Sequence, residues 1–353
     1  MRLGIRLLII VAFTLFLSSP RIISKGSADS GANHQGRNTH FGVSGGNTND
    51  ITRRFCCSGT LGALVTDGTT NYVLSNNHVL GLSGKARAGD DISQPGLIDN
   101  GCAVSTVVAD FAAAAPLGSS NVDAAIAQLR PGLMDGSGFI EDIGVPSSVV
   151  RAPSVGLGVA KSGRTTGFTT GTIASINTSV SVQYQASCGQ GKKFTVSYTN
   201  QVVINSSTFS AGGDSGSLIV TNDSNHQPVA LLFAGSSTTT IGNPVGQVLT
   251  QVSNALGRTV SFIGTGQAMS VETLAENGLL LQDVEHVKAV KERYEPELFS
   301  QAGVFGVGVG IGNPGEATIM VFVDRTNGRA HAMPARLDNV KVQVFYTDEF
   351  VAR

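Results

Sequence analysis

The sequence predicts a mainly β protein with two β units of similar size, followed by a small α+β unit. Short runs of Val, Ile, Thr and Ser fill the middle of the chain and are broken by Gly, Asn and Asp. Glycine is abundant, with 44 among 353 residues, and tryptophan is absent. Runs of this kind are typical of strands joined by turns. Charged, helix-favouring stretches appear after about residue 265, where we expect the third unit to begin.

The charge balance is close to neutral. The chain has 24 Lys and Arg against 25 Asp and Glu, and only 14% of its residues are charged. Such a chain has no strong field to attract nucleic acid or an anionic membrane surface. We therefore expect no nucleic-acid partner.

The N-terminal segment has the pattern of a secretory signal. Arg2 and Arg6 precede an apolar stretch from Leu7 to Leu17, which is too short to span a bilayer comfortably. We predict a signal peptide or uncleaved anchor at 1–24 and a flexible polar segment at 25–50. The protein should then be secreted or reside in the cell envelope or periplasm, with no stable membrane domain unless the first segment is retained.

Four cysteines fit an oxidising compartment and up to two disulfides. Cys56 and Cys57 are adjacent, and a bond between neighbours forms a strained ring. Each is therefore expected to pair with Cys102 or Cys188, and both such pairings remain open. Zinc is the alternative, but the spacing lacks a CxxC repeat. We expect no metal and no cofactor.

The strands of the first two β units are predicted from their turn residues and from runs of strand-favouring residues. Strands are predicted at 60–66 and 71–75 around a turn at Asp67 and Gly68, and then at 104–111 and 122–129. A Gly/Pro-rich connection near 131–150 separates the units. The second unit has strand-like runs at 155–161, 171–176, 180–184, 194–198, 201–204, 217–220 and 228–234. Apolar residues at helical spacing then predict a helix from Val245 to Leu256, with Gly257 past its end.

The third unit mixes helices and strands. Helical segments are predicted at 270–276 and 283–298, with a break at Pro296. Strands are predicted at 304–311, 318–323 and 340–346. The domain boundaries are thus 51–264 for the paired β units and 265–353 for the C-terminal unit, which we expect to fold separately and to be dispensable for chemistry.

The most informative run is Ser210 to Ser217, Ser-Ala-Gly-Gly-Asp-Ser-Gly-Ser. Ser215 lies between glycines, where the chain can make a tight exposed bend. The backbone N–H groups of Gly213 and Ser215 can then converge on one point, as in an oxyanion hole. A serine hydroxyl is a poor nucleophile at neutral pH and needs a base that is oriented by a carboxylate.

Two residues fit those supporting roles. His78 follows the strand-like run Tyr72 to Ser75, and Asp123 is embedded among apolar residues, which an unpaired carboxylate should not tolerate. We predict His78, Asp123 and Ser215 as a catalytic triad, with Asp110 the next carboxylate to consider.

These segments resemble the His, Asp and Ser motifs of the chymotrypsin-like serine proteases, in that superfamily's chain order. The stretch from Lys161 to Ile173 resembles bacterial α-lytic and streptogrisin-type proteases, and Leu232–Ser236 resembles their substrate-lining strand. The likeness covers about 57–256. It departs from the subgroup at Val79, which replaces a cysteine, at Ala160 and Thr170, which stand where a disulfide is usual, and at Ser217, which replaces a glycine.

The resemblance implies a fold and an activity. The fold would be two six-stranded antiparallel β-barrels with the active site between them. The activity would be that of a serine endopeptidase, which cleaves protein or peptide substrates through an acyl-enzyme. A catalytically silent, peptide-binding scaffold of the same fold is the alternative.

The resemblance also implies roles for residues around the triad. Substrate would lie along Phe233, Ala234 and Gly235 as an added β-strand, with a side-chain pocket near Phe209. Phe209 can equally be a core aromatic. A buried Asp214 would need a cation, which Lys161 or, second, Arg164 would supply. The alternative partners of Asp214 are backbone N–H groups.

Overall fold

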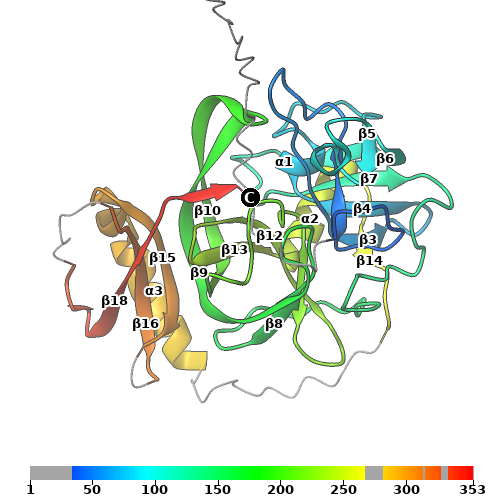
Figure 1. The fold of residues 1–353 in the computed structure, drawn as a ribbon. Coiled ribbons are helices and arrows are strands. Elements are labelled where there is room, and N and C mark those ends of the chain that lie inside the picture. Colours follow the sequence, from blue (N-terminus) through cyan, green and yellow to red (C-terminus); the bar gives the residue numbers. More distant parts are fainter. Residues whose placement is uncertain (1–33, 267–280, 313–314, 327–332, 353) are drawn as a thin grey trace, which may run out of the picture. The chain divides into compact units, whose positions relative to one another are not determined.

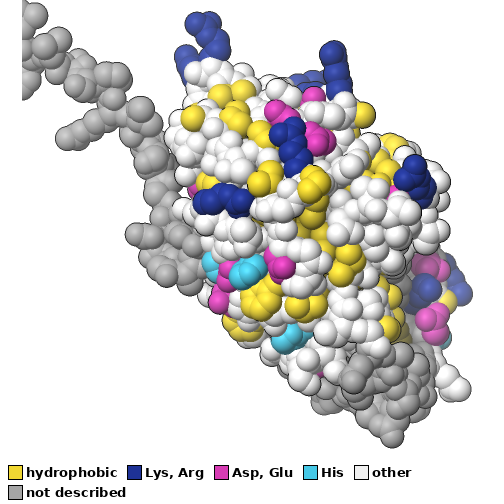
Figure 2. Space-filling view, turned by 90° about the vertical axis from the view of Figure 1, so that its right-hand side faces the viewer, with side chains coloured by type: hydrophobic (Ala, Val, Ile, Leu, Met, Phe, Trp, Pro, Cys, Tyr) yellow, Lys and Arg dark blue, Asp and Glu magenta, His cyan; other side chains and the backbone are white. Residues whose placement is uncertain are grey.

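The computed structural model describes residues 34–266, 281–312, 315–326 and 333–352 (Figure 1). The predicted signal or anchor segment, the first part of the polar segment and the predicted helix at 270–276 lie outside these ranges. None of the helices within them is long and apolar enough to cross a membrane. On the face shown in Figure 2, Lys and Arg side chains stand apart from one another, as the nearly neutral composition leads one to expect.

The first barrel is built from the N-terminal strands. These are β1 (Val43–Asn47), β2 (Gly59–Leu61), β3 (Ala63–Thr66), β4 (Asn71–Ser75), β5 (Asp91–Gln94), β6 (Thr106–Ala114) and β7 (Ala125–Leu129). The order β3-β4-β7-β6-β5-β1-β2 is antiparallel throughout. Because β2 and β3 are two halves of one strand bent at Gly62, the ring closes. With β2 and β3 counted as one strand, the first barrel has six strands.

Part of the predicted polar segment belongs to this barrel, so its expected boundary at residue 50 is wrong. Phe41 and Val43 are fully buried, Phe41 within the first core, and β1 pairs with both β2 and β5. The strand reads Val-Ser-Gly-Gly-Asn, and such small and polar residues give no strand signal in sequence. They are buried here because neighbouring backbone and side chains pack closely over them.

The second barrel follows after a connection that contains no long strand. Its strands are β8 (Gly158–Lys161), β9 (Thr169–Ser187), β10 (Gln190–Asn205), β11 (Leu218–Thr221), β12 (Pro228–Gly235) and β13 (Thr239–Pro244). They form the closed antiparallel ring β8-β9-β10-β13-β12-β11. The two predicted six-stranded barrels are therefore confirmed. The strands predicted at 171–176 and 180–184 form one long, bulged strand, β9. Those predicted at 194–198 and 201–204 form a second one, β10.

The predicted helix after the second barrel is confirmed as α2 (Val245–Leu256). Gly257 ends it in the left-handed conformation, with φ of 74°. The buried side chains Val245, Val248 and Val252 pack into the core of the first barrel. Three short elements complete this part of the chain: α1 (Asn77–Leu80), the 3-10 turn Leu97–Asn100, and β14 (Ser261–Phe262), which pairs with β3.

The C-terminal unit contains one long helix and five strands within the described residues. These are α3 (Leu281–Ser300), β15 (Val304–Ile311), β16 (Ala317–Asp324), β17 (Arg336–Leu337), β18 (Val340–Thr347) and β19 (Phe350–Ala352). The three predicted strands are confirmed, and β19 was not predicted. The predicted break at Pro296 is wrong, because α3 continues through it to Ser300. Burial of Leu298 against Val304 and its neighbours holds this last turn in place.

The C-terminal unit is not separate from the second barrel. Strand β15 pairs with β9 as well as with β16, and β19 pairs with β9 and β12. One hydrophobic core joins the two parts: it contains Tyr184, Tyr198 and Phe233 from the barrel and Phe322 and Phe350 from the C-terminal unit. The expected boundary near residue 265 therefore falls between elements that share a sheet and a core.

Candidate active site

His78 and Asp123 come together at the ends of two paired strands. His78 is in α1, just after β4, and Asp123 lies just before β7; these strands pair antiparallel, with Ser75 opposite Ala125. His78 Nδ1 lies 2.6 Å from Asp123 Oδ2, and the His78 backbone N–H donates to Oδ1 at 3.1 Å. The Asp123 side chain is fully buried, whereas that of His78 is 15% exposed. The carboxylate therefore fixes both the ring and the backbone of His78.

Further hydrogen bonds hold Asp123 in place. Its carbonyl accepts from Asn76 Nδ2 at 2.7 Å, and its N–H donates to Asn243 Oδ1 at 3.0 Å. The Tyr184 hydroxyl donates to Asp123 Oδ2 at 2.8 Å and lies 2.7 Å from the Tyr198 hydroxyl. Burial, together with the Asp123 charge, raises the pKa of Tyr184 well above its ordinary value. Tyr184 thus stays protonated and remains a donor to the carboxylate.

Sequence reasoning missed Tyr184. The residue is 61 positions from Asp123 along the chain and lies in a strand with no local motif. Only the fold of the β9–β10 hairpin brings it to the carboxylate, so no signal in the sequence could have identified it.

We expect Tyr184→Phe to lower kcat/KM roughly ten-fold, since one donor to the Asp123 carboxylate is lost. The carboxylate would then attract the protonated His78 ring more strongly, so the acidic limb of the pH–rate profile should move to higher pH. Tyr198→Phe is the control, because its hydroxyl contacts Tyr184 and not Asp123; its effect should be smaller. An unshifted pH profile in Tyr184→Phe would show that the hydroxyl only fills space.

Ser215 lies in a glycine-flanked turn that packs against the first barrel. Gly213 and Gly216 have φ of 98° and 95°, a region that other residues rarely adopt. The Thr60 N–H donates to the Ser215 carbonyl at 2.7 Å, and the Thr60 hydroxyl donates to the Gly213 carbonyl at 3.0 Å. A Cβ on Gly62 would lie 1.9 Å from the Gly216 carbonyl oxygen. Because Gly62 has no side chain, the first barrel can approach the Ser215 turn of the second barrel this closely.

The polar groups of this turn have defined directions. Ser215 Oγ donates to the Phe233 carbonyl at 3.3 Å, and Ser215 as a whole is buried. Among the described residues, the backbone N–H groups of Gly213 and Ser215 donate to no protein acceptor.

Asp214 and Lys161 are both fully buried, and Lys161 Nζ lies 3.6 Å from Asp214 Oδ2. Burial lowers the pKa of Lys161, and Asp214 opposes that shift. The Lys161 ammonium also donates to Thr166 Oγ1 and to the Gly167 carbonyl, the latter at 2.9 Å. Asp214 accepts from the backbone N–H groups of Thr165, Thr166 and Ala211 and from the Thr166 hydroxyl. Asp214 therefore has both of the expected partners, the Lys161 ammonium and backbone N–H groups.

Two other charged residues named from the sequence have their own partners. Arg164, the second candidate for Asp214, binds Asp99 through two hydrogen bonds of 2.6 Å. Asp110, the second candidate for His78, lies 2.7 Å from Arg130 and is partly exposed. Asp110 therefore does not contact His78, and Arg164, although it lies beside Gly213, pairs with Asp99 and not with Asp214.

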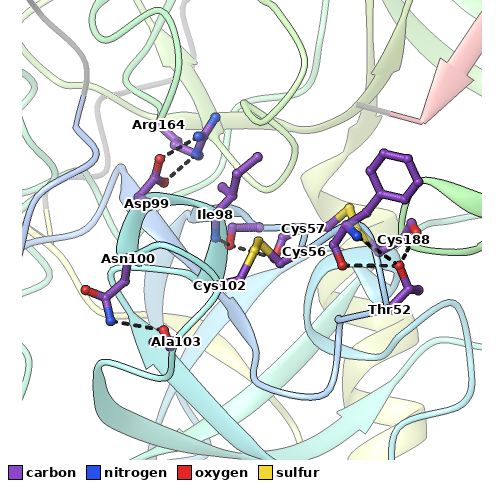
Figure 3. Close-up of a disulfide and its surroundings, with 12 residues drawn as sticks. Thr52, Cys56, Cys57, Ile98, Asp99, Asn100, Cys102, Ala103, Arg164 and Cys188 are labelled. Atoms are coloured by element: carbon purple, nitrogen blue, oxygen red, sulfur yellow. Dashed lines mark hydrogen bonds and ion pairs between the residues drawn. A yellow bond between two sulfur atoms is a disulfide. The ribbon is translucent and has the colours of Figure 1, made fainter. Parts of the chain in front are cut away.

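The four cysteines form two disulfides (Figure 3). Cys56 bonds to Cys102, and Cys57 bonds to Cys188. Cys188 is at the tip of the β9–β10 hairpin, and its carbonyl accepts from the Thr52 hydroxyl at 3.4 Å. The second bond therefore ties the hairpin that carries Tyr184 to the first barrel. No cysteine in the chain is a free thiol, and two disulfides fit an oxidising environment.

A cavity of about 370 Å³ opens beside His78, with Gly213, Tyr184, Asp50 and Ala352 among its lining residues. Burial raises the pKa of Asp50 from 3.8 to about 6, against the opposing effects of His78 and Lys85. Because the pKa is higher in the folded state, protonated Asp50 favours folding. That stabilisation is fully present below pH 3.8 and is lost as the pH rises through about 6.

We expect Asp50→Asn to raise the free energy of unfolding at pH 8 by about 1–3 kcal/mol, because the buried charge is removed. The gain should shrink towards zero below pH 4. Urea unfolding of both proteins at pH 4, 6 and 8 measures it. A difference that does not vary with pH would contradict the raised pKa.

The predicted substrate-binding residues divide into two groups. Phe233, Ala234 and Gly235 are in β12, next to the Ser215 turn. Phe209 is fully buried in the core of the second barrel with Ile204 and Leu232. Phe209 therefore has the core role that the sequence left open.

No protein-family model matches the sequence, and no curated protein matches it significantly. Solved structures of bacterial serine proteases resemble it in fold. A glutamic-acid-specific serine protease is 21% identical, with a TM-score of 0.44 over 63% of this chain and 98% of its own. Protease A of Thermobifida fusca is 16% identical, with a TM-score of 0.41 over 64% and 98%. A chymotrypsin of Cellulomonas bogoriensis is 18% identical, with a TM-score of 0.40 over 64% and 99%.

The architecture itself places the three predicted residues. His78 and Asp123 belong to the first barrel, and Ser215 belongs to the second, at the turn where the two barrels meet. Both barrels are closed, and α2 follows the second one. With this arrangement the chain has the two-barrel chymotrypsin-like fold, to which it adds a C-terminal unit.

Proposed function

We propose that the protein is a serine endopeptidase that cleaves peptide bonds through an acyl-enzyme. The observation that carries the proposal is the 2.6 Å contact between His78 and the fully buried Asp123. A carboxylate held by Tyr184 and by the His78 N–H is suited to orienting a catalytic base. These donors offset the cost of burying the carboxylate and hold it in one orientation toward His78.

In the proposed reaction His78 accepts the proton of Ser215 as the hydroxyl attacks the substrate carbonyl. The Ser215 hydroxyl must first break its hydrogen bond with the Phe233 carbonyl. Asp123 stabilises the positive charge that forms on His78, and the N–H groups of Gly213 and Ser215 stabilise the oxyanion. His78 then gives its proton to the leaving amine, and water hydrolyses the ester by the same steps. The mechanism requires no metal or other cofactor.

The proposed substrate is a protein or peptide. An extended protein or peptide segment would add to the edge of β12 at Ala234 and Gly235, through main-chain hydrogen bonds. We place the protein outside the cytoplasm, secreted or in the cell envelope, in agreement with its disulfides.

Purified protein should react with a fluorophosphonate probe, which modifies activated serines, and mass spectrometry should locate the label on Ser215. Ser215→Ala is the matched control and should remain unlabelled. If neither the folded wild-type protein nor its Val351→Pro variant is labelled or hydrolyses any member of a mixed peptide library, the silent peptide-binding scaffold becomes the better description.

A further inference from the structure

The C-terminal strand β19 lies on the edge where a substrate would bind. Ala352 pairs with Ala234 and Val351 pairs with Gly235, antiparallel to β12. On its other side, β19 pairs parallel with β9, with Phe350 opposite Val182. In Figure 1 it is the red strand that leaves the C-terminal sheet and reaches the barrel.

This edge of β12 has room for a single strand. On the opposite side of β12, strand β13 already pairs with Ala234 and Gly235. Strand β11 covers the same side as β19 only as far as Leu231. An incoming peptide and β19 would thus need the same backbone groups, and only one of them can be paired at a time.

The end of β19 also points to the reactive groups. Ala352 lines the cavity that His78 and Gly213 line, and with Val351 it lines a second hollow over Ala211 and Gly212. The segment therefore covers both the strand edge and the approach to the Ser215 turn.

Contacts of Asp348 and of the first residue of β19, Phe350, anchor the segment, whereas the side chain of Val351 is partly exposed. Phe350 is fully buried near Phe322 and Phe305, at ring distances of 5.9 and 6.2 Å. Asp348 pairs with Arg325 at 2.8 Å and accepts from the Ser237 hydroxyl. Val351, by contrast, is 39% exposed. The end of the strand can therefore separate from β12 while Phe350 keeps its place.

We propose that β19 is a built-in inhibitor that occupies the peptide-binding edge of β12, so that substrate binds only when residues 351 and 352 move away. This regulation rests on the proposed peptidase function. Because the chain supplies its own peptide at a fixed position, the site is closed until a partner, a substrate of high affinity or a change in the tail opens it.

The test uses the full chain and weakens β19 at one position. Since β19 has a strand on each side, Val351→Pro removes an N–H that faces a neighbour, whereas Val351→Thr keeps it. Two measurements are made: hydrolysis of a mixed peptide library, and, in a Ser215→Ala background, binding of a fluorescent peptide with the sequence of residues 347–352. Val351→Pro should increase both hydrolysis and binding at least about ten-fold, and Val351→Thr should leave them unchanged.

Asp348→Ala provides a second variant in case Val351→Pro does not fold. It removes the contacts with Arg325 and Ser237, away from the reactive residues, and should increase peptide binding in the same direction. If folded variants bind and hydrolyse as the wild type does, β19 is a fixed structural strand and the proposal fails while the peptidase function stands. Increased peptide binding without hydrolysis or fluorophosphonate labelling would support the inhibitory strand and overturn the peptidase function.

Discussion

Ser215→Ala and His78→Ala are expected to lower kcat by a factor of about 10⁴ to 10⁶ each. The two residues act as one unit, so loss of either removes the activated nucleophile. Asp123→Asn should cost somewhat less, because the Asn76 and Asn243 contacts to the Asp123 backbone are retained and the oxyanion hole persists. Steady-state hydrolysis of a peptide selected from a mixed library measures these effects.

Stability controls separate chemistry from folding in this series. Ser215→Ala removes a single hydroxyl whose hydrogen bond is long, at 3.3 Å, so circular dichroism and the free energy of unfolding should remain close to those of the wild type. Full activity in Asp123→Asn would show that a different group orients His78. Asp110 could not be that group without leaving Arg130.

Lys161→Ala is expected to lower the free energy of unfolding by roughly 3–5 kcal/mol, because it leaves the buried Asp214 carboxylate without its cation. Asp214 directly precedes Ser215, so distortion should spread to the N–H groups of Gly213 and Ser215. We expect kcat/KM to fall about 10²- to 10³-fold through the loss of oxyanion stabilisation. Chemical unfolding and peptide hydrolysis provide the two measurements.

The double variant Lys161→Ala, Asp214→Asn tests the cause. It removes both charges, so part of the lost stability should return if the stranded carboxylate is responsible. Normal activity in Lys161→Ala alone would show that the four other donors to Asp214 are sufficient.

The sequence predicted the elements with strong local patterns. Val245, Val248 and Val252 repeat at helical spacing, and Gly257 ends the helix as expected. The hairpin around Asp67 and Gly68 likewise combines turn residues with apolar runs, and β3 and β4 pair across it. Both features are decided within about a dozen residues.

What the sequence could not reveal depends on contacts between distant segments. Strand β1 is made of small and polar residues whose burial comes from β2 and β5. Strand β19 has three residues, too few for any periodicity, and exists because β9 and β12 flank it. Pro296 remains helical because Leu298 is buried beyond it. In each case tertiary packing overrides the local preference.

The residues of the candidate site likewise differ in how far the sequence predicts them. His78, Asp123 and the Ser215 turn lie in recognisable local motifs, whereas the Tyr184 hydroxyl comes from a hairpin with no such motif. Phe209 could be assigned to core or pocket only once the neighbours of its ring were known.

The bond between Cys57 and Cys188 makes the site dependent on its redox surroundings. In a reducing compartment both sulfurs are thiols, and the tip of the β9–β10 hairpin has no covalent link to the first barrel. The contact between Tyr184 and Asp123, and the β9 flank of β19, would then rely on hydrogen bonds and packing alone. The candidate site therefore gains this covalent support only in oxidising surroundings, where the disulfide between Cys57 and Cys188 is stable.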